Sequence, residues 1–161
     1  IEAIAQAANH DPLFPGREDG CFRTAAILTA LAWTESRFQP TLVGDNGKSF
    51  GLYQIRPPAA NAMGKAITTN MLTNARDASF VAVDLVRQSM HRAKDKSWEE
   101  KLLWWSAANL PSGLTQDPST LMKRSLTRML LADKIVRDHF PAYEALAKPT
   151  TSELRQLSAG G

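Results

Sequence analysis

A turn-rich stretch at residues 41–56 interrupts a chain whose other local signals are mostly helical. Asp45, Asn46 and Gly47 are residue types that favour tight turns. Residues 50–55 follow them with side chains common in β-strands. This pattern predicts an irregular loop or a small β-hairpin. Because helical patterns stand on both sides, we expect a mainly α fold with one small β element.

Helical periodicity covers most of the remaining chain, since apolar residues recur at three- and four-residue steps. Leu28, Leu31 and Glu35 share one stripe of such a helix. Ser97 and Glu100 have the spacing of a capping box, in which both side chains satisfy amide donors at a helix start. The predicted helices span, approximately, residues 1–8, 23–36, 59–65, 74–93, 97–109 and 119–139.

Length and composition fit one globular domain. The chain has 161 residues, of which 43% are apolar and 22% charged, so it is long enough to bury a sizeable core. No internal repeat or second domain is evident. We therefore expect one globular domain at residues 1–148, followed by a polar tail or linker at residues 149–161.

Several classes of protein are disfavoured by simple counts. The net charge of +3 would assist binding to an anionic polymer, but does not select among cell wall, nucleic acid and membrane. Cys21 is the single cysteine, which excludes an intramolecular disulfide and a cysteine zinc site; we expect it to be a small buried residue. No apolar run approaches a membrane span, no signal peptide is visible, and no metal-ligand spacing or phosphate loop occurs. We expect no cofactor.

Glu35 is the candidate for acid chemistry. It lies one helical turn after Leu31 and two after Leu28, on the side expected to approach the core. Burial disfavours the charged form of a carboxyl group and raises its pKa, which suits a proton donor at neutral pH. Glycosidases need such a donor to protonate the leaving oxygen. From periodicity alone, the alternative is a partly exposed glutamate near a helix end, paired with Arg37.

Two ordered motifs surround this glutamate. Residues 35–40 (Glu-Ser-Arg-Phe-Gln-Pro) precede residues 49–57 (Ser-Phe-Gly-Leu-Tyr-Gln-Ile-Arg-Pro), and together they resemble the signature of soluble lytic transglycosylases and goose-type lysozymes. Residues 74–78 resemble the family's Asn-x-x-x-Gly helix start, and residues 107–109 its Ala-Tyr-Asn element. The resemblance extends over about residues 20–135.

This resemblance implies a lysozyme-like fold with a small β-hairpin next to the catalytic helix, and Glu35 as the catalytic acid. Asp45 stands five residues before Phe50, where goose-type lysozymes have an Asp that holds or deprotonates a water. In an Asp-Asn-Gly sequence it is also an ordinary turn residue. A further acidic position of the goose-type enzymes falls at Arg56.

The resemblance also implies that Ser49, Gln54, Tyr53 and Asn109 bind substrate. An amide such as Gln54 offers both a donor and an acceptor to an N-acetyl sugar; for Ser49 and Gln54 the alternative is hydrogen bonding within the hairpin. Tyr53 either stacks on a sugar or belongs to the core, and Asn109 either reaches the cleft or caps a helix. Gly51 is expected where two backbones approach closely.

By the same resemblance, the chain is a peptidoglycan muramidase that cleaves the β-1,4 bond between N-acetylmuramic acid and N-acetylglucosamine. The outcome is hydrolysis or lytic transglycosylation to 1,6-anhydro-muropeptides. The expected partner is the peptidoglycan glycan strand rather than nucleic acid, and the expected location is periplasmic, extracellular or virion-associated. Ala108 and Leu110 stand where the family has Tyr and Gly. They leave open a non-catalytic glycan-binding or structural domain of the same fold.

Overall fold

The computed structural model describes residues 1–61, 64–92 and, within 127–138, all but 129, 133, 136 and 137. The predicted helix at 97–109 with its capping box, Asn109, the first part of the predicted 119–139 helix and the 149–161 tail lie outside the described residues. The described residues of 127–138 have helical backbone. The labelled elements are α1 (Glu2–His10), α2 (Gly20–Ser36), β1 (Val43–Gly44), β2 (Ser49–Phe50), α3 (Pro57–Asn61), α4 (Thr69–Thr73) and α5 (Ala75–Arg92).

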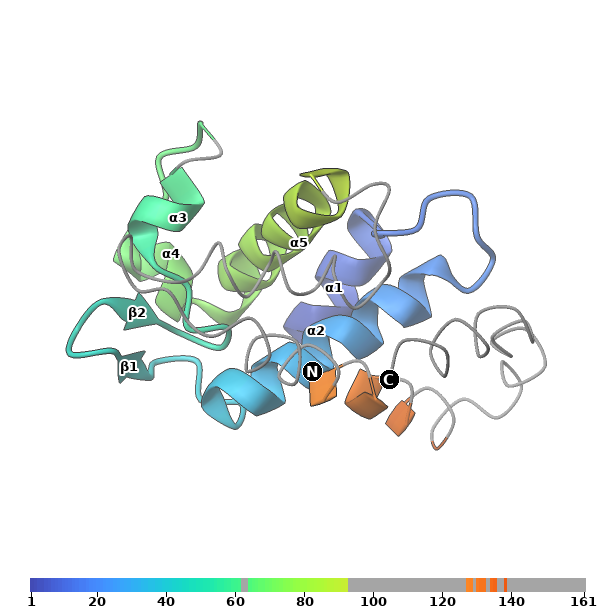
Figure 1. Ribbon diagram of the computed structural model, residues 1–161, viewed down its shortest axis with the longest axis horizontal. Coiled ribbons are helices and arrows are strands. Elements are labelled where there is room, and N and C mark those ends of the chain that lie inside the picture. The colour runs from blue at the N-terminus through green and yellow to red at the C-terminus, as the bar shows by residue number, and fades with distance from the viewer. Residues whose placement is uncertain (62–63, 93–126, 129, 133, 136–137, 139–161) are drawn as a thin grey trace, which may run out of the picture.

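The described part is mainly helical with one small antiparallel sheet, as expected for a lysozyme-like α+β fold. Helices α1, α2 and α5 pack against one another around the core, and α4 packs against α5 (Figure 1). Leu28 and Leu31 are almost completely buried, which confirms that their stripe of α2 faces inward. The core also includes Ile4, Ala7, Leu13, Tyr53, Ile55, Leu72, Val83 and Val86.

Helix α2 begins at Gly20, three residues before the predicted start. A Cβ at Gly20 would lie 2.3 Å from the carbonyl oxygen of Phe14, so a residue without a side chain is required at this approach. Asp19 precedes the helix and is held by the side chains of Arg17 and Arg23. Although burial raises the pKa of Asp19, the hydrogen bonds from these arginines outweigh it and hold that pKa below its usual value.

Helix α2 ends at Ser36 and is capped by Arg37 in an αL motif. The amide of Arg37 donates to the Trp33 carbonyl (3.2 Å) and that of Phe38 to the Ala32 carbonyl (3.3 Å). Arg37 takes the left-handed conformation at this cap, with φ 53°. The chain then turns directly into the hairpin, which lies beside the C-terminal end of α2 (Figure 1). The predicted hairpin is thus confirmed, with Val43 opposite Phe50 and Gly44 opposite Ser49 as the paired positions.

Elements α3 to α5 follow the hairpin. The helix predicted at 59–65 is shorter and earlier, at Pro57–Asn61. The predicted 74–93 helix is confirmed as α5, whose start is capped by the Asn74 side chain: its Oδ1 accepts from the amides of Arg76 (3.0 Å) and Asp77 (3.2 Å). No helix within the described residues is long and apolar enough to cross a membrane.

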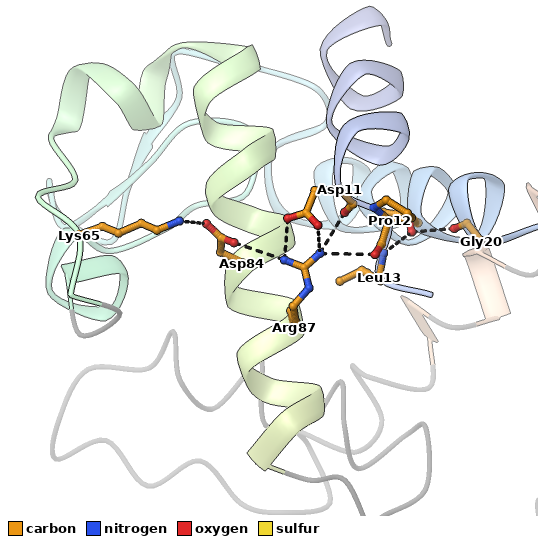
Figure 2. Close-up of polar contacts among 8 residues, drawn as sticks. Asp11, Pro12, Leu13, Gly20, Lys65, Asp84 and Arg87 are labelled. Carbon is orange, nitrogen blue, oxygen red and sulfur yellow. Dashed lines mark hydrogen bonds and ion pairs between the residues drawn. The ribbon is translucent and has the colours of Figure 1, made fainter. Parts of the chain in front are cut away.

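A polar network joins α5 to the loop that links α1 with α2 (Figure 2). The Arg87 guanidinium contacts both carboxylate oxygens of Asp11 at 2.7 Å and donates to the Asp11 carbonyl at 3.0 Å. Asp84, one turn earlier on α5, accepts from Arg87 and from Lys65. In the same loop the Leu13 amide donates to the Thr24 hydroxyl (2.9 Å). These contacts fasten three segments that are distant in sequence.

Candidate functional site

Glu35 lies in the last turn of α2, with its side chain 20% exposed. It forms an ion pair with Arg128, whose side chain is 9% exposed. The Arg37 guanidinium instead lies over the Trp33 ring, 4.3 Å from its centroid. A carboxylate at a helix C-terminus faces the negative end of the helix dipole, and a neighbouring cation offsets that repulsion. The site therefore has a largely buried carboxyl group, Glu35, that is paired with a buried arginine, Arg128.

Ser36 fastens the end of α2 to the loop after the hairpin. Its buried hydroxyl is within hydrogen-bonding distance of the Leu52 carbonyl (2.8 Å) and of the Ala32 carbonyl (3.1 Å). The neighbouring residue is Glu35, so this bond holds the candidate acid next to the hairpin. This role was not predicted, although Ser36 and Leu52 both belong to the two sequence motifs.

Asp45 lies on the hairpin turn with 57% of its side chain exposed. Asp45, Asn46 and Gly47 all have positive φ (50°, 55° and 84°), a conformation that Asp, Asn and Gly adopt more readily than other residues. The Asp45 carboxylate pairs with Arg56 at 2.9 Å. Arg56 stands where the goose-type enzymes have a further acidic residue. Here that position holds a cation, which pairs with Asp45, the candidate second carboxylate. Only the Asp45 side of this pair is exposed, because the Arg56 side chain is 13% exposed.

Ser49 and Gln54 contact each other inside the hairpin. The buried Ser49 hydroxyl donates to Gln54 Oε1 (2.9 Å), and Gln54 Nε2 donates to the carbonyls of Leu42 (3.1 Å) and Gly51 (2.9 Å). A Cβ at Gly44 would lie 2.1 Å from Gln54 Oε1. Ser49 and Gln54 therefore form hydrogen bonds within the hairpin, which was the alternative to substrate binding. Gln54 keeps a positive φ of 47° within this arrangement.

Tyr53 is fully buried in the core. Its hydroxyl lies 3.0 Å from that of Ser79, which itself donates to the Ala75 carbonyl (2.8 Å). Since a serine hydroxyl has one hydrogen, Tyr53 is the donor in this pair. Burial raises the pKa of Tyr53 well above its usual value. In this position the ring presents no face to a sugar, so the structure corrects the expectation of stacking in favour of the core alternative.

Gly51 shows the close approach expected of it. Its φ is +76°, and a Cβ there would lie 1.7 Å from the Leu72 carbonyl oxygen of α4.

Asn109 lies outside the described residues, so its predicted role stays a prediction. Within the described residues, no group of three or more His, Cys, Asp or Glu side chains could hold a metal ion. Sequence patterns gave no signal for Arg128, because 93 residues separate it from Glu35.

A comparison with protein-family models identifies a transglycosylase SLT domain over residues 23–107. The chain belongs to the SLT transglycosylase family. The SLT match spans most of α2, the hairpin and α5, and it includes all the predicted site residues except Asn109. No curated protein and no solved structure matches the chain. SLT membership indicates transglycosylase chemistry on peptidoglycan and, because peptidoglycan is the substrate, a place at the cell envelope.

Proposed function

We propose that this SLT domain is a lytic transglycosylase that cleaves the β-1,4 bond between N-acetylmuramic acid and N-acetylglucosamine. Glu35 serves first as acid and then as base. The observation that carries the proposal is the largely buried Glu35 carboxyl at the end of α2, fastened beside the hairpin through Ser36. The family match adds the substrate and the reaction class.

In the first step, Glu35 protonates the glycosidic oxygen as the bond to C1 of the muramyl residue breaks. N-Acetylglucosamine then leaves as an alcohol, and the positive charge at C1 is shared with the ring oxygen or taken by the substrate's own N-acetyl oxygen. In the second step, the Glu35 carboxylate removes the proton of the muramyl 6-hydroxyl while O6 bonds to C1. A 1,6-anhydro ring forms, no water is consumed, and Glu35 regains its proton.

The Asp45–Arg56 pair supports transglycosylation over hydrolysis. Hydrolysis with inversion needs a second carboxylate that activates water on the far face of the sugar. Asp45 is the candidate for that role, but its charge is matched by Arg56 at 2.9 Å. The Asp45 oxygen that accepts from Arg56 is less accessible to a water molecule. Hydrolysis by Asp45 remains the second candidate, because this carboxylate is exposed on the hairpin turn.

Mass spectrometry of muropeptides released from purified peptidoglycan tests the proposal. We expect the wild type to release products with anhydro ends. Loss of a general acid costs about 100-fold or more, so Glu35→Gln should release them at least about 100 times more slowly. Asp45→Asn is the matched control, since it also changes one carboxyl to an amide, and it should keep both the rate and the anhydro product.

Three results would contradict the proposal. Products with reducing ends in the wild type, lost in Asp45→Asn, would indicate hydrolysis with Asp45 as base. Release by Glu35→Gln at the wild-type rate would remove Glu35 from the chemistry. Binding of glycan strands without any release would favour a non-catalytic domain of the same fold.

A further inference from the structure

The ion pair between Arg128 and Glu35 is a long-range polar contact of the candidate acid. Both side chains are largely buried, at 9% and 20% exposure. By contrast, the Lys134–Asp138 pair on the same helical stretch is exposed, at 65% and 47%. A buried pair interacts strongly because water screens it little, and either charge alone would be costly there. The buried ion pair with Glu35 therefore holds the Arg128 side chain in place.

Small residues bring the 127–138 stretch close to α2. Ala132 packs against Ala26 and Ala30, with Leu131 and Ile135 alongside. Arg128 precedes Ala132 by one helical turn, whereas Glu35 follows Ala30 by about one turn. The two segments therefore run in opposite directions, and this packing delivers the guanidinium to the C-terminal end of α2. There a cation is favoured by the helix dipole, whichever side chain it meets.

The contact is made directly to the Glu35 carboxylate. Arg128 donates through one terminal nitrogen to Glu35 Oε1. This contact to Oε1 restricts rotation of the carboxylate. The paired carboxylate also corresponds to the ionised state that follows proton donation, which is the state that must accept a proton from the muramyl 6-hydroxyl.

We propose that Arg128 is a positioning residue for the transglycosylase reaction: it holds the Glu35 carboxylate in the orientation from which that group receives the 6-hydroxyl proton. This inference rests on the proposed function. The guanidinium forms no bond to the sugar and exchanges no proton. Its effect is on the alignment of the reacting groups, where displacement of about 1 Å costs about 100-fold in rate.

Steady-state kinetics on soluble, uncrosslinked peptidoglycan glycan strands test this role. We expect Arg128→Met to lower kcat by about 100-fold and to leave KM within about twofold of the wild type, because the side chain acts on Glu35. Arg128→Lys should recover part of kcat, since an ammonium still pairs with Oε1 but lacks the planar guanidinium. Lys134→Met is the matched control: it removes a cation from the exposed pair on the same stretch and should leave kcat unchanged.

A double variant separates positioning from folding. Glu35→Gln/Arg128→Met removes both charges of the pair, so neither is left buried alone. Its residual rate should equal that of Glu35→Gln, because Arg128 has no carboxylate left to orient. Circular dichroism and thermal melting show which variants are folded. If Arg128→Met does not fold, the lowered kcat and unchanged KM of Arg128→Lys carry the same test.

The outcomes distinguish this inference from the proposed function. An active wild type with equal kcat in the folded Arg128 variants would overturn the positioning role alone. So would a double variant that is much slower than Glu35→Gln, because Arg128 would then act independently of Glu35. A wild type that releases no anhydro-muropeptides would overturn the proposed function and this inference with it.

Discussion

Tyr53 shows at the scale of one residue how burial turns a polar side chain into a structural one. Its phenol is fully enclosed and donates to Ser79, which in turn donates to the Ala75 carbonyl. Both hydroxyl hydrogens, that of Tyr53 and that of Ser79, are thereby donated in hydrogen bonds. A phenolate in this position would lose its hydration and its donor role together, so the folded chain retains the neutral form.

Alkaline pH is accordingly expected to destabilise the chain through Tyr53. A tyrosine in an unfolded chain ionises near pH ~10, whereas burial keeps the folded phenol neutral beyond that pH. Protonation of Tyr53 therefore favours the folded state fully below about pH 10, and this contribution is lost as pH rises further. Urea unfolding at pH 9 and pH 11 should show a larger loss for the wild type than for Tyr53→Phe.

Ser79→Ala is the control for this measurement. It removes the hydrogen-bond partner and costs about 1 kcal/mol at neutral pH, but keeps the buried phenol. The alkaline loss should remain in Ser79→Ala. Equal losses in the wild type and Tyr53→Phe would assign the alkaline effect to other groups.

Among the elements, the hairpin is the one on which the candidate site depends most. Ser36 joins it to α2, and the Gly51 amide donates to the Leu42 carbonyl at 2.8 Å. Gly51 also lets the hairpin loop approach α4, since its missing side chain leaves room for the Leu72 carbonyl. Local turn chemistry predicted the hairpin, but its contact with α4 was not predicted. Helix α4 has five residues, too few to show a helical period.

Gly51→Ala should separate the hairpin from α4. A Cβ would meet the Leu72 oxygen at 1.7 Å, and the backbone already has a φ of +76°. We expect the free energy of unfolding to fall by about 2–4 kcal/mol from the combined steric and backbone costs, as measured by urea denaturation. Gly47→Ala is the matched control, because its φ is +84° but its Cβ would meet nothing within 4 Å. It should cost only about 1–2 kcal/mol, and equal losses in the two variants would contradict the role of the contact.

Within the residues that the structure describes, two polar contacts join distant parts of the chain. Arg87 and Asp11 are separated by 76 residues, and Arg128 and Glu35 by 93. The first contact fixes α5 to the loop before α2 (Figure 2), and the second brings a late helical stretch to the end of α2. The position of Glu35 is therefore set from both ends of its helix.

Arg87→Met should weaken the first of these connections. It removes a two-pronged contact with Asp11 and a bond to the Asp11 carbonyl. Because both side chains are partly exposed, we expect a loss of about 1–2 kcal/mol in urea denaturation. Lys65→Met, which breaks an exposed pair with Asp84 in the same network, should cost less than about 0.5 kcal/mol. A similar loss in both variants would show that the forked contact has no special weight.

Much of the fold and the identity of the candidate acid could be predicted without coordinates. Apolar periodicity located α2 and α5, turn residues located the hairpin, and the motifs at residues 35–40 and 49–57 singled out Glu35. The start of α2 at Gly20 was not predicted, because glycine is a poor helix former. A glycine is needed there because the Phe14 backbone lies too close for a side chain.

Local sequence patterns indicate the helical class, the β-hairpin, the family and the candidate acid Glu35. These follow from steric preferences and spacing that act within a few residues. Tertiary packing places Tyr53 in the core, brings Ser49 and Gln54 into a hydrogen bond, and pairs Arg128 with Glu35. Burial and charge pairing depend on which distant segments meet, and no local pattern around either residue records that meeting.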